Sequence, residues 1–175
     1  MKEPGANDST LADVHPPELR RRARTERRAV LALVAILVLL GATSLLGVRT
    51  NSASASDGTW SMTVRYPQIA RSGLDVQWQV RVEHVGGFRD PIRLAVNGSY
   101  FDIFETQGFH PVPSSTTRDG ELMYLEFDPP PGDVFLVDYD AYIQGSSQLG
   151  RRGEVHLMDG QEPRLTVTYR TWLAP

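Results

Sequence analysis

An uncharged run at residues 29–48, AVLALVAILVLLGATSLLGV, constrains this chain more than any other feature. At about 1.5 Å of rise per residue, roughly 20 helical residues span the ~30 Å hydrocarbon core of a bilayer. The run therefore predicts one transmembrane α-helix, and the lipid bilayer is the first partner that the sequence indicates.

Residues 17–28 precede the run and form a basic collar that contains the sequence RRRARTERR. Arginines on one flank of a span keep that flank in the cytoplasm, and Arg49 is the only basic residue directly after the run. Residues 1–16 have few large apolar side chains, which is typical of a disordered tail. We expect a single-pass plasma-membrane protein with a cytoplasmic N-terminal tail and its C-terminal part outside.

Residues 49–58, RTNSASASDG, are small and polar without periodicity, which predicts a short linker. The segment Ala53-Ser54-Ala55 resembles the cleavage site of a secretory signal. Signal peptides usually have an apolar core of about 7–15 residues, shorter than the run at 29–48, so an uncleaved anchor is favoured. Cleavage near Ala55 stays open as the alternative.

Residues 59–175 change to a period of two, which is typical of β-strands with one buried face. The clearest case is 74–83, where Leu, Val and Trp alternate with Asp, Gln, Arg and Glu. Further strands are expected, including one at 100–105, and 108–120 reads as a long loop. Seven or eight strands separated by turn signals predict an all-β, antiparallel β-sandwich, with a closed barrel as the alternative.

Composition excludes several classes of function. The chain has no cysteine, so disulfides and thiolate metal sites are absent. Residues 50–175 carry ten arginines against sixteen acids, which argues against a nucleic-acid partner. Lys2 is the only lysine, and abundant Ala, Gly, Val, Asp and Pro are typical of a high-GC bacterium.

The β region resembles fibronectin type III and related immunoglobulin-like domains. Trp78 lies in an early alternating strand, and Pro131-Gly132 forms a corner before the alternating segment Phe135-Leu136-Val137. The resemblance covers about residues 59–172. It implies a β-sandwich that binds a partner or acts as a spacer, and it implies no enzymatic activity. Phe135 stands where tyrosine is more usual, and the paired cysteines of antibody-type domains are missing. The layout is similar to small single-pass membrane proteins of uncharacterised role in high-GC bacteria.

The sequence shows no motif for catalysis. There is no Gly-x-Ser-x-Gly nucleophile elbow, and no pair of histidines one helical turn apart. The four histidines lie in separate segments: His15, His84, His110 and His156. We therefore expect no enzyme activity, no catalytic residue, no cofactor and no resident metal.

Two groups of residues are candidates for binding. We predict an exposed aromatic rim that binds a partner at Phe104, Phe109 and His110. Asp138 and Asp140 are two apart on a predicted strand, so both carboxylates leave the same face and could bind calcium. We expect a non-enzymatic accessory protein that binds another envelope membrane protein. The alternative is a carbohydrate- or calcium-binding envelope module.

Overall fold

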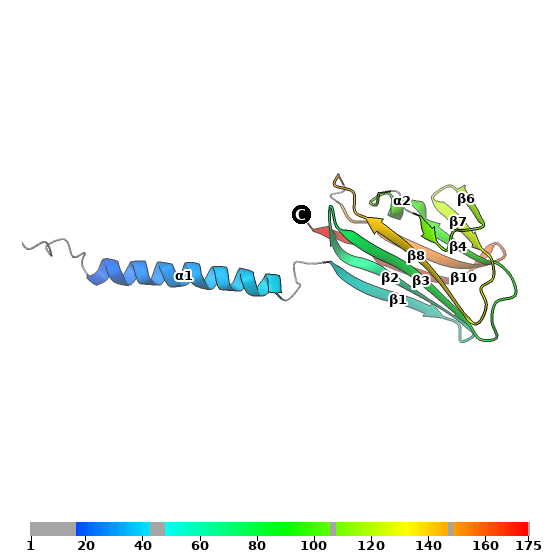
Figure 1. Cartoon of the computed structure of the whole chain (residues 1–175), viewed down its shortest axis with the longest axis horizontal. Coiled ribbons are helices and arrows are strands. Elements are labelled where there is room, and N and C mark those ends of the chain that lie inside the picture. Colours follow the sequence, from blue (N-terminus) through cyan, green and yellow to red (C-terminus); the bar gives the residue numbers. More distant parts are fainter. Residues whose placement is uncertain (1–16, 43–47, 106–107, 147–148, 175) are drawn as a thin grey trace, which may run out of the picture. The chain divides into compact units, whose positions relative to one another are not determined.

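The computed structural model describes residues 17–42, 48–105, 108–146 and 149–174 (Figure 1). The chain divides into two compact units, Met1–Leu46 and Gly47–Pro175. The predicted tail at 1–16 lies outside the described residues, as do residues 43–47 of the predicted span.

The first unit contains a single described element, helix α1 (Pro17–Ala42), which includes the basic collar. The proline stands at the first position, where its missing N–H costs no hydrogen bond. In the described part of the chain, no helix is long and apolar enough to cross a membrane. The large apolar side chains that the structure describes in α1 are 50–64% exposed: Val30, Leu31, Leu33, Val34, Ile36, Leu37, Val38 and Leu39.

The second unit is a sandwich of two largely antiparallel β-sheets, which confirms the all-β prediction. One sheet has the order β1-β2-β3-β8-β5, and a short strand, β11, pairs with β2 in parallel. Its strands are β1 (Arg49–Ser56), β2 (Trp60–Arg71), β3 (Asp75–His84), β5 (Phe109–His110), β8 (Val134–Tyr142) and β11 (Trp172–Ala174).

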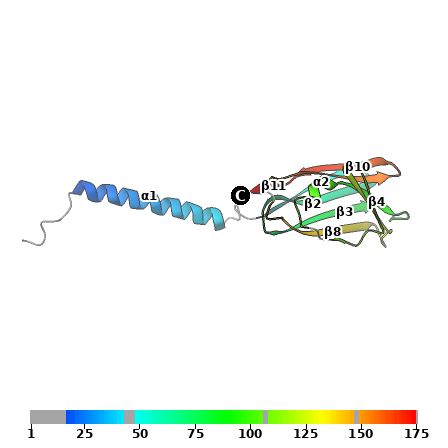
Figure 2. The same cartoon turned by 90° about the horizontal axis from the view of Figure 1, so that it is seen from above.

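The other sheet has the order β10-β9-β4-β7-β6. Figure 2 shows β10 and β8 in different layers, so the closed barrel was the wrong alternative. Two such sheets, with sequential strands divided between them, are consistent with an immunoglobulin-like fold. The strands of this sheet are β4 (Ile92–Asn97), β6 (Ser115–Asp119), β7 (Leu122–Phe127), β9 (Arg152–Asp159) and β10 (Glu162–Arg170).

The core lies between the inward faces of the two sheets. Trp78 on β3 is fully buried, and its indole Nε1–H donates to the hydroxyl of Tyr169 on β10 at 2.6 Å. This bond joins the two sheets and satisfies a polar group that would otherwise be costly to bury. Burial raises the pKa of Tyr169 well above its ordinary value, so the ring stays neutral.

The predicted linker at 49–58 is wrong for most of its length. Residues Arg49–Ser56 form β1, which pairs antiparallel with β2, and Ala53 and Ala55 pack against the core. β1 is an edge strand with small side chains and a mostly exposed surface, so it lacks the alternation that marks a half-buried strand. Its backbone hydrogen bonds to β2 hold it in place, and the two alanines add partial burial.

The region after β4 also differs from the prediction. The strand expected at 100–105 is replaced by a short helix, α2 (Gly98–Phe101), in which the Asn97 side chain accepts a hydrogen bond from the Tyr100 amide. The loop expected at 108–120 contains β5 and β6. Eleven strands are therefore described instead of seven or eight.

Candidate functional site

The predicted aromatic rim does not form an exposed surface. Phe104 is only 2% exposed, and Phe109 is partly buried with its ring centroid 4.8 Å from that of Tyr139. The turn of α2 allows Phe101 and Phe104 to pack together, with ring centroids 6.2 Å apart. Of the three predicted rim residues, only His110 is exposed.

Asp138 and Asp140 lie on the outer face of β8, and the sheet brings His110 beside them because His110 pairs with Asp138. The Asp138 carboxylate accepts hydrogen bonds from Gln79 Nε2 at 2.6 Å and Gln77 Nε2 at 3.2 Å. Within the described ranges no cluster of three or more His, Cys, Asp or Glu could hold a metal ion. The calcium face stays a prediction.

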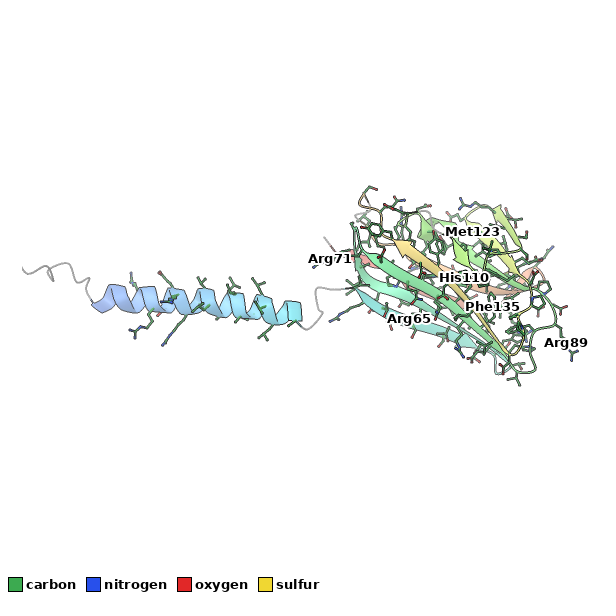
Figure 3. All side chains as sticks on the ribbon, viewed as in Figure 1. Arg65, Arg71, Arg89, His110, Met123 and Phe135 are labelled. Atoms are coloured by element: carbon green, nitrogen blue, oxygen red, sulfur yellow. The ribbon has the colours of Figure 1, made fainter. Side chains whose placement is uncertain are left out.

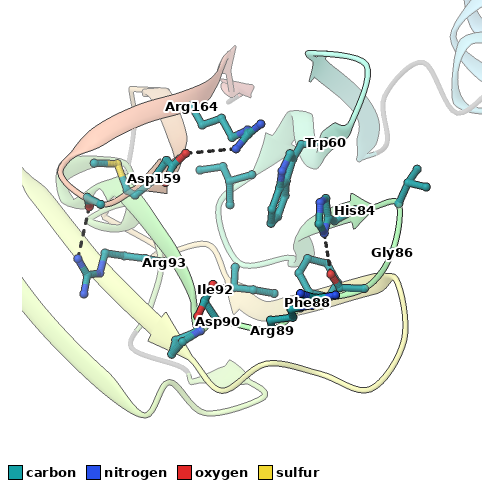
Figure 4. Close-up of a pocket in the computed structure, with 16 residues that line it drawn as sticks. Trp60, His84, Gly86, Phe88, Arg89, Asp90, Ile92, Arg93, Asp159 and Arg164 are labelled. Atoms are coloured by element: carbon teal, nitrogen blue, oxygen red, sulfur yellow. Dashed lines mark hydrogen bonds and ion pairs between the residues drawn. The ribbon is translucent and has the colours of Figure 1, made fainter.

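A pocket of about 430 Å³ at one end of the sandwich was not predicted from the sequence (Figure 4). It lies where the β3–β4 connection faces the turn between β9 and β10. Aromatic rings, aliphatic side chains and charged groups all contribute to it. Among its lining residues are Trp60, His84, Phe88, Ile92, Leu157 and Met158.

An aromatic stack forms one wall of this pocket. The rings of Trp60 and His84 are stacked at 3.9 Å with an angle of 17°, and Phe88 meets Trp60 edge-on at 5.7 Å. His84 Nδ1 lies 2.7 Å from the Gly87 carbonyl oxygen, which fixes the imidazole. Gly87 has a φ of 79°, and a Cβ there would lie 3.0 Å from the Gly132 carbonyl oxygen, so glycine is required.

Charged side chains surround the stack. The Arg164 guanidinium lies over the Trp60 ring at 5.2 Å and forms ion pairs with Asp57 at 2.8 Å and Asp159 at 3.2 Å. Figure 4 shows Trp60 between Arg164 and His84, so both ring faces are covered. Arg89 is exposed at the rim, and it forms no ion pair with any described residue.

We predict an acid-sensitive contact at the edge of this pocket. The amides of Trp60 and Thr59, followed by the Arg164 guanidinium, lower the pKa of Asp57 to about 2. Since the folded-state pKa is depressed, the contact stabilises the fold above the ordinary carboxyl pKa and is lost as pH falls through about 2. NMR titration of the Asp57 carboxyl carbon should show this low pKa.

Arg164→Gln supplies the matched comparison for this titration. The variant should raise the pKa of Asp57 only in part, because the two backbone amides remain. An ordinary pKa for Asp57 in the unsubstituted chain would contradict the geometry.

The sequence contained one signal for the pocket. His84 and Phe88 flank the Gly86-Gly87 turn in the sequence, but Trp60 lies far from that turn and joins them only because it pairs with His84 across β2 and β3. Comparison with known proteins adds no assignment: no protein-family model matches the chain, and no curated protein matches it.

Proposed function

We propose that this chain is a non-enzymatic, single-pass envelope protein whose β-sandwich binds another membrane protein outside the cytoplasm. Residues 29–48 serve as an uncleaved anchor, and the arginines of 17–28 keep the N-terminus in the cytoplasm. The pocket bounded by Trp60, Phe88 and Arg89 is the binding site.

The anchor is supported by the surface of α1. Its apolar side chains from Val30 to Leu39 are at least half exposed, and they do not form a single stripe. A helix that is apolar all round is normally covered by protein or by lipid. The following residues 43–48 continue the run without a charge, which favours lipid.

One observation carries the assignment of the binding site: the pocket combines an apolar wall with an arginine that has no described ion-pair partner. Aromatic and arginine side chains supply much of the binding energy at protein interfaces. Phe88 and Met158, which are partly exposed, offer contacts to an apolar side chain above the buried Ile92 and Leu157, and Arg89 offers a charge to a carboxylate. The expected partner is a protein segment that presents an apolar residue beside an acidic one.

The carbohydrate alternative has weaker support. Sugar rings commonly stack on an open aromatic face, whereas His84 and Arg164 cover the two faces of Trp60. Calorimetry of the 47–175 fragment with calcium and with cell-wall glycans tests this alternative. Saturable heat with either ligand would favour it over the protein partner.

Site-specific photo-crosslinking in intact membranes tests the proposed site. A photoreactive amino acid at Phe88 should capture one envelope protein, and Arg89→Gln should reduce that product about 5-fold or more, as expected for a charge-assisted contact. Val112 is an exposed residue outside the pocket and serves as the control position. Equal products from Phe88 and Val112, or none from Phe88, would overturn the assignment.

The anchor has its own test. An epitope tag placed before Arg20 should stay on the mature chain, and the chain should resist extraction from membranes by alkaline carbonate. Loss of the tag would show that cleavage near Ala55 removes residues 29–48.

A further inference from the structure

Exposed apolar side chains gather at the end of the sandwich where the second unit begins. Leu74, Leu149 and Trp172 are 40%, 80% and 53% exposed, respectively. The Leu74 carbonyl accepts a hydrogen bond from the Ile143 amide, which places Leu74 beside the connection between β8 and β9. Leu149 lies in that same connection.

Trp172 belongs to the same end. The backbone of Gly150 approaches that of Thr171 and Trp172 so closely that a Cβ on Gly150 would overlap it. Trp172 on β11 and Arg49 on β1 both pair with Ile69 of β2. The first and last described strands of this unit therefore meet at this end.

Arginines surround these apolar side chains. Arg170 places its guanidinium 3.7 Å from the centroid of the Trp172 ring, and Arg152 pairs across the strands with Arg170. Two like charges directly opposite each other on paired strands are destabilising. We define the basic end as these three apolar residues together with Arg49, Arg71, Arg151, Arg152 and Arg170.

The charges of the basic end are unbalanced. None of its five arginines forms an ion pair with a described residue, and the Nε of Arg71 is buried without a hydrogen-bond partner there. Figure 3 shows Arg71 at this end and Arg89, at the pocket, at the other. Acids near this end include Asp75 and Glu105, which lie beside Tyr142, and Glu154, which is two residues from Arg152 on β9.

We propose that the basic end binds the headgroup layer of an anionic bilayer. Tryptophan and leucine insert at the boundary between headgroups and acyl chains, and arginine binds lipid phosphates. Arg49 directly follows residues 29–48, so a span there holds Arg49 at the lipid–water boundary. The inference rests on the proposed anchor, and it makes the bilayer a second ligand of the β-sandwich.

Fluorescence of the full chain in vesicles tests the inference. Spin labels on the headgroups should quench Trp172 in vesicles of phosphatidylglycerol and phosphatidylcholine, and much less in phosphatidylcholine alone. In the Trp172→Phe variant only Trp60 and Trp78 fluoresce, so the quenching that this variant loses belongs to Trp172. Equal quenching of Trp172 in the two kinds of vesicle would overturn the proposal. So would the absence of quenching in a chain that resists carbonate extraction.

Flotation of the 47–175 fragment separates this proposal from the anchor, since these residues form a compact unit with their own core. The fragment should float with the anionic vesicles, and added salt should reduce its binding. If carbonate extracts the full chain, the anchor is wrong. In that case flotation alone tests the basic end: binding of the fragment to anionic vesicles would support the proposal, and no binding would contradict it.

Arginine variants of the fragment measure the contribution of charge. Each arginine near an anionic surface contributes about 5-fold to partitioning, so Arg49→Gln, Arg71→Gln and Arg170→Gln together should lower it on the order of 100-fold. The matched control replaces Arg65, Arg81 and Arg118, which lie outside the basic end. A loss as large in the control would show that net charge alone drives binding.

Discussion

Gly153→Ala is expected to destabilise the β-sandwich by about 2–5 kcal/mol, combining overpacking with the loss of a buried hydrogen bond. Gly153 on β9 pairs with the buried Tyr169 on β10, and a Cβ on Gly153 would overlap the tyrosine ring. The ring cannot move away without breaking its bond to the Trp78 indole. Chemical denaturation of the 47–175 fragment measures the change, which is a large part of a typical stability of about 5–15 kcal/mol.

Gly145→Ala is the matched control, because no heavy atom lies within 4 Å of a Cβ at that position. Its effect should stay within about 0.5 kcal/mol. In a Tyr169→Leu background the overlap with the ring is removed, so adding Gly153→Ala should cost less than it does in the unsubstituted chain. Equal costs in the two backgrounds would show that the Tyr169 ring is not the cause.

Removing β1 is the second change with a large expected effect. A fragment that begins at residue 59, the boundary predicted from the sequence, lacks the strand that covers one edge of β2. Each lost backbone hydrogen bond contributes a net of about 1 kcal/mol, so the fragment should lose several kcal/mol. The bare edge of β2 should also promote association, which size-exclusion chromatography detects.

A fragment that begins at residue 49 is the control for this truncation. It retains β1 and, compared with the fragment that begins at residue 47, loses only the core contact of the partly buried Val48, so its denaturation midpoint should fall only slightly. If the fragments from 49 and 59 had the same midpoint and elution volume, β1 would contribute nothing to the fold.

The alternation of apolar and polar residues was sufficient to predict the strands that have one face in the core. β3 is the clearest case, because Val76, Trp78, Val80 and Val82 are all buried. The same rule missed β1, where the outer residues are exposed serines and the inner ones, Ala53 and Ala55, are too small to mark a buried face. An edge strand of small residues has no side-chain signature, since its partner supplies the pairing.

The candidate sites were harder to predict for a different reason. The sequence predicts a rim at Phe104 and Phe109, but the α2 turn directs Phe104 into the core. The pocket brings Trp60, His84 and Arg164 together from three strands and depends on the register of each pair. Sequence alone gives the faces of strands, but the sites depend on which strand ends meet.

The pairing of β1 with β2 also determines how the sandwich carries mechanical load. β1 runs from Arg49, beside the proposed anchor, to Ser56, close to Trp60 of the proposed partner pocket. A pull between the membrane and a bound partner would act along these strands. Their backbone hydrogen bonds lie across the pull, so they would resist it together instead of opening one at a time. Under the proposed anchor and partner, the β1–β2 ladder is the part of the domain that such a pull would load.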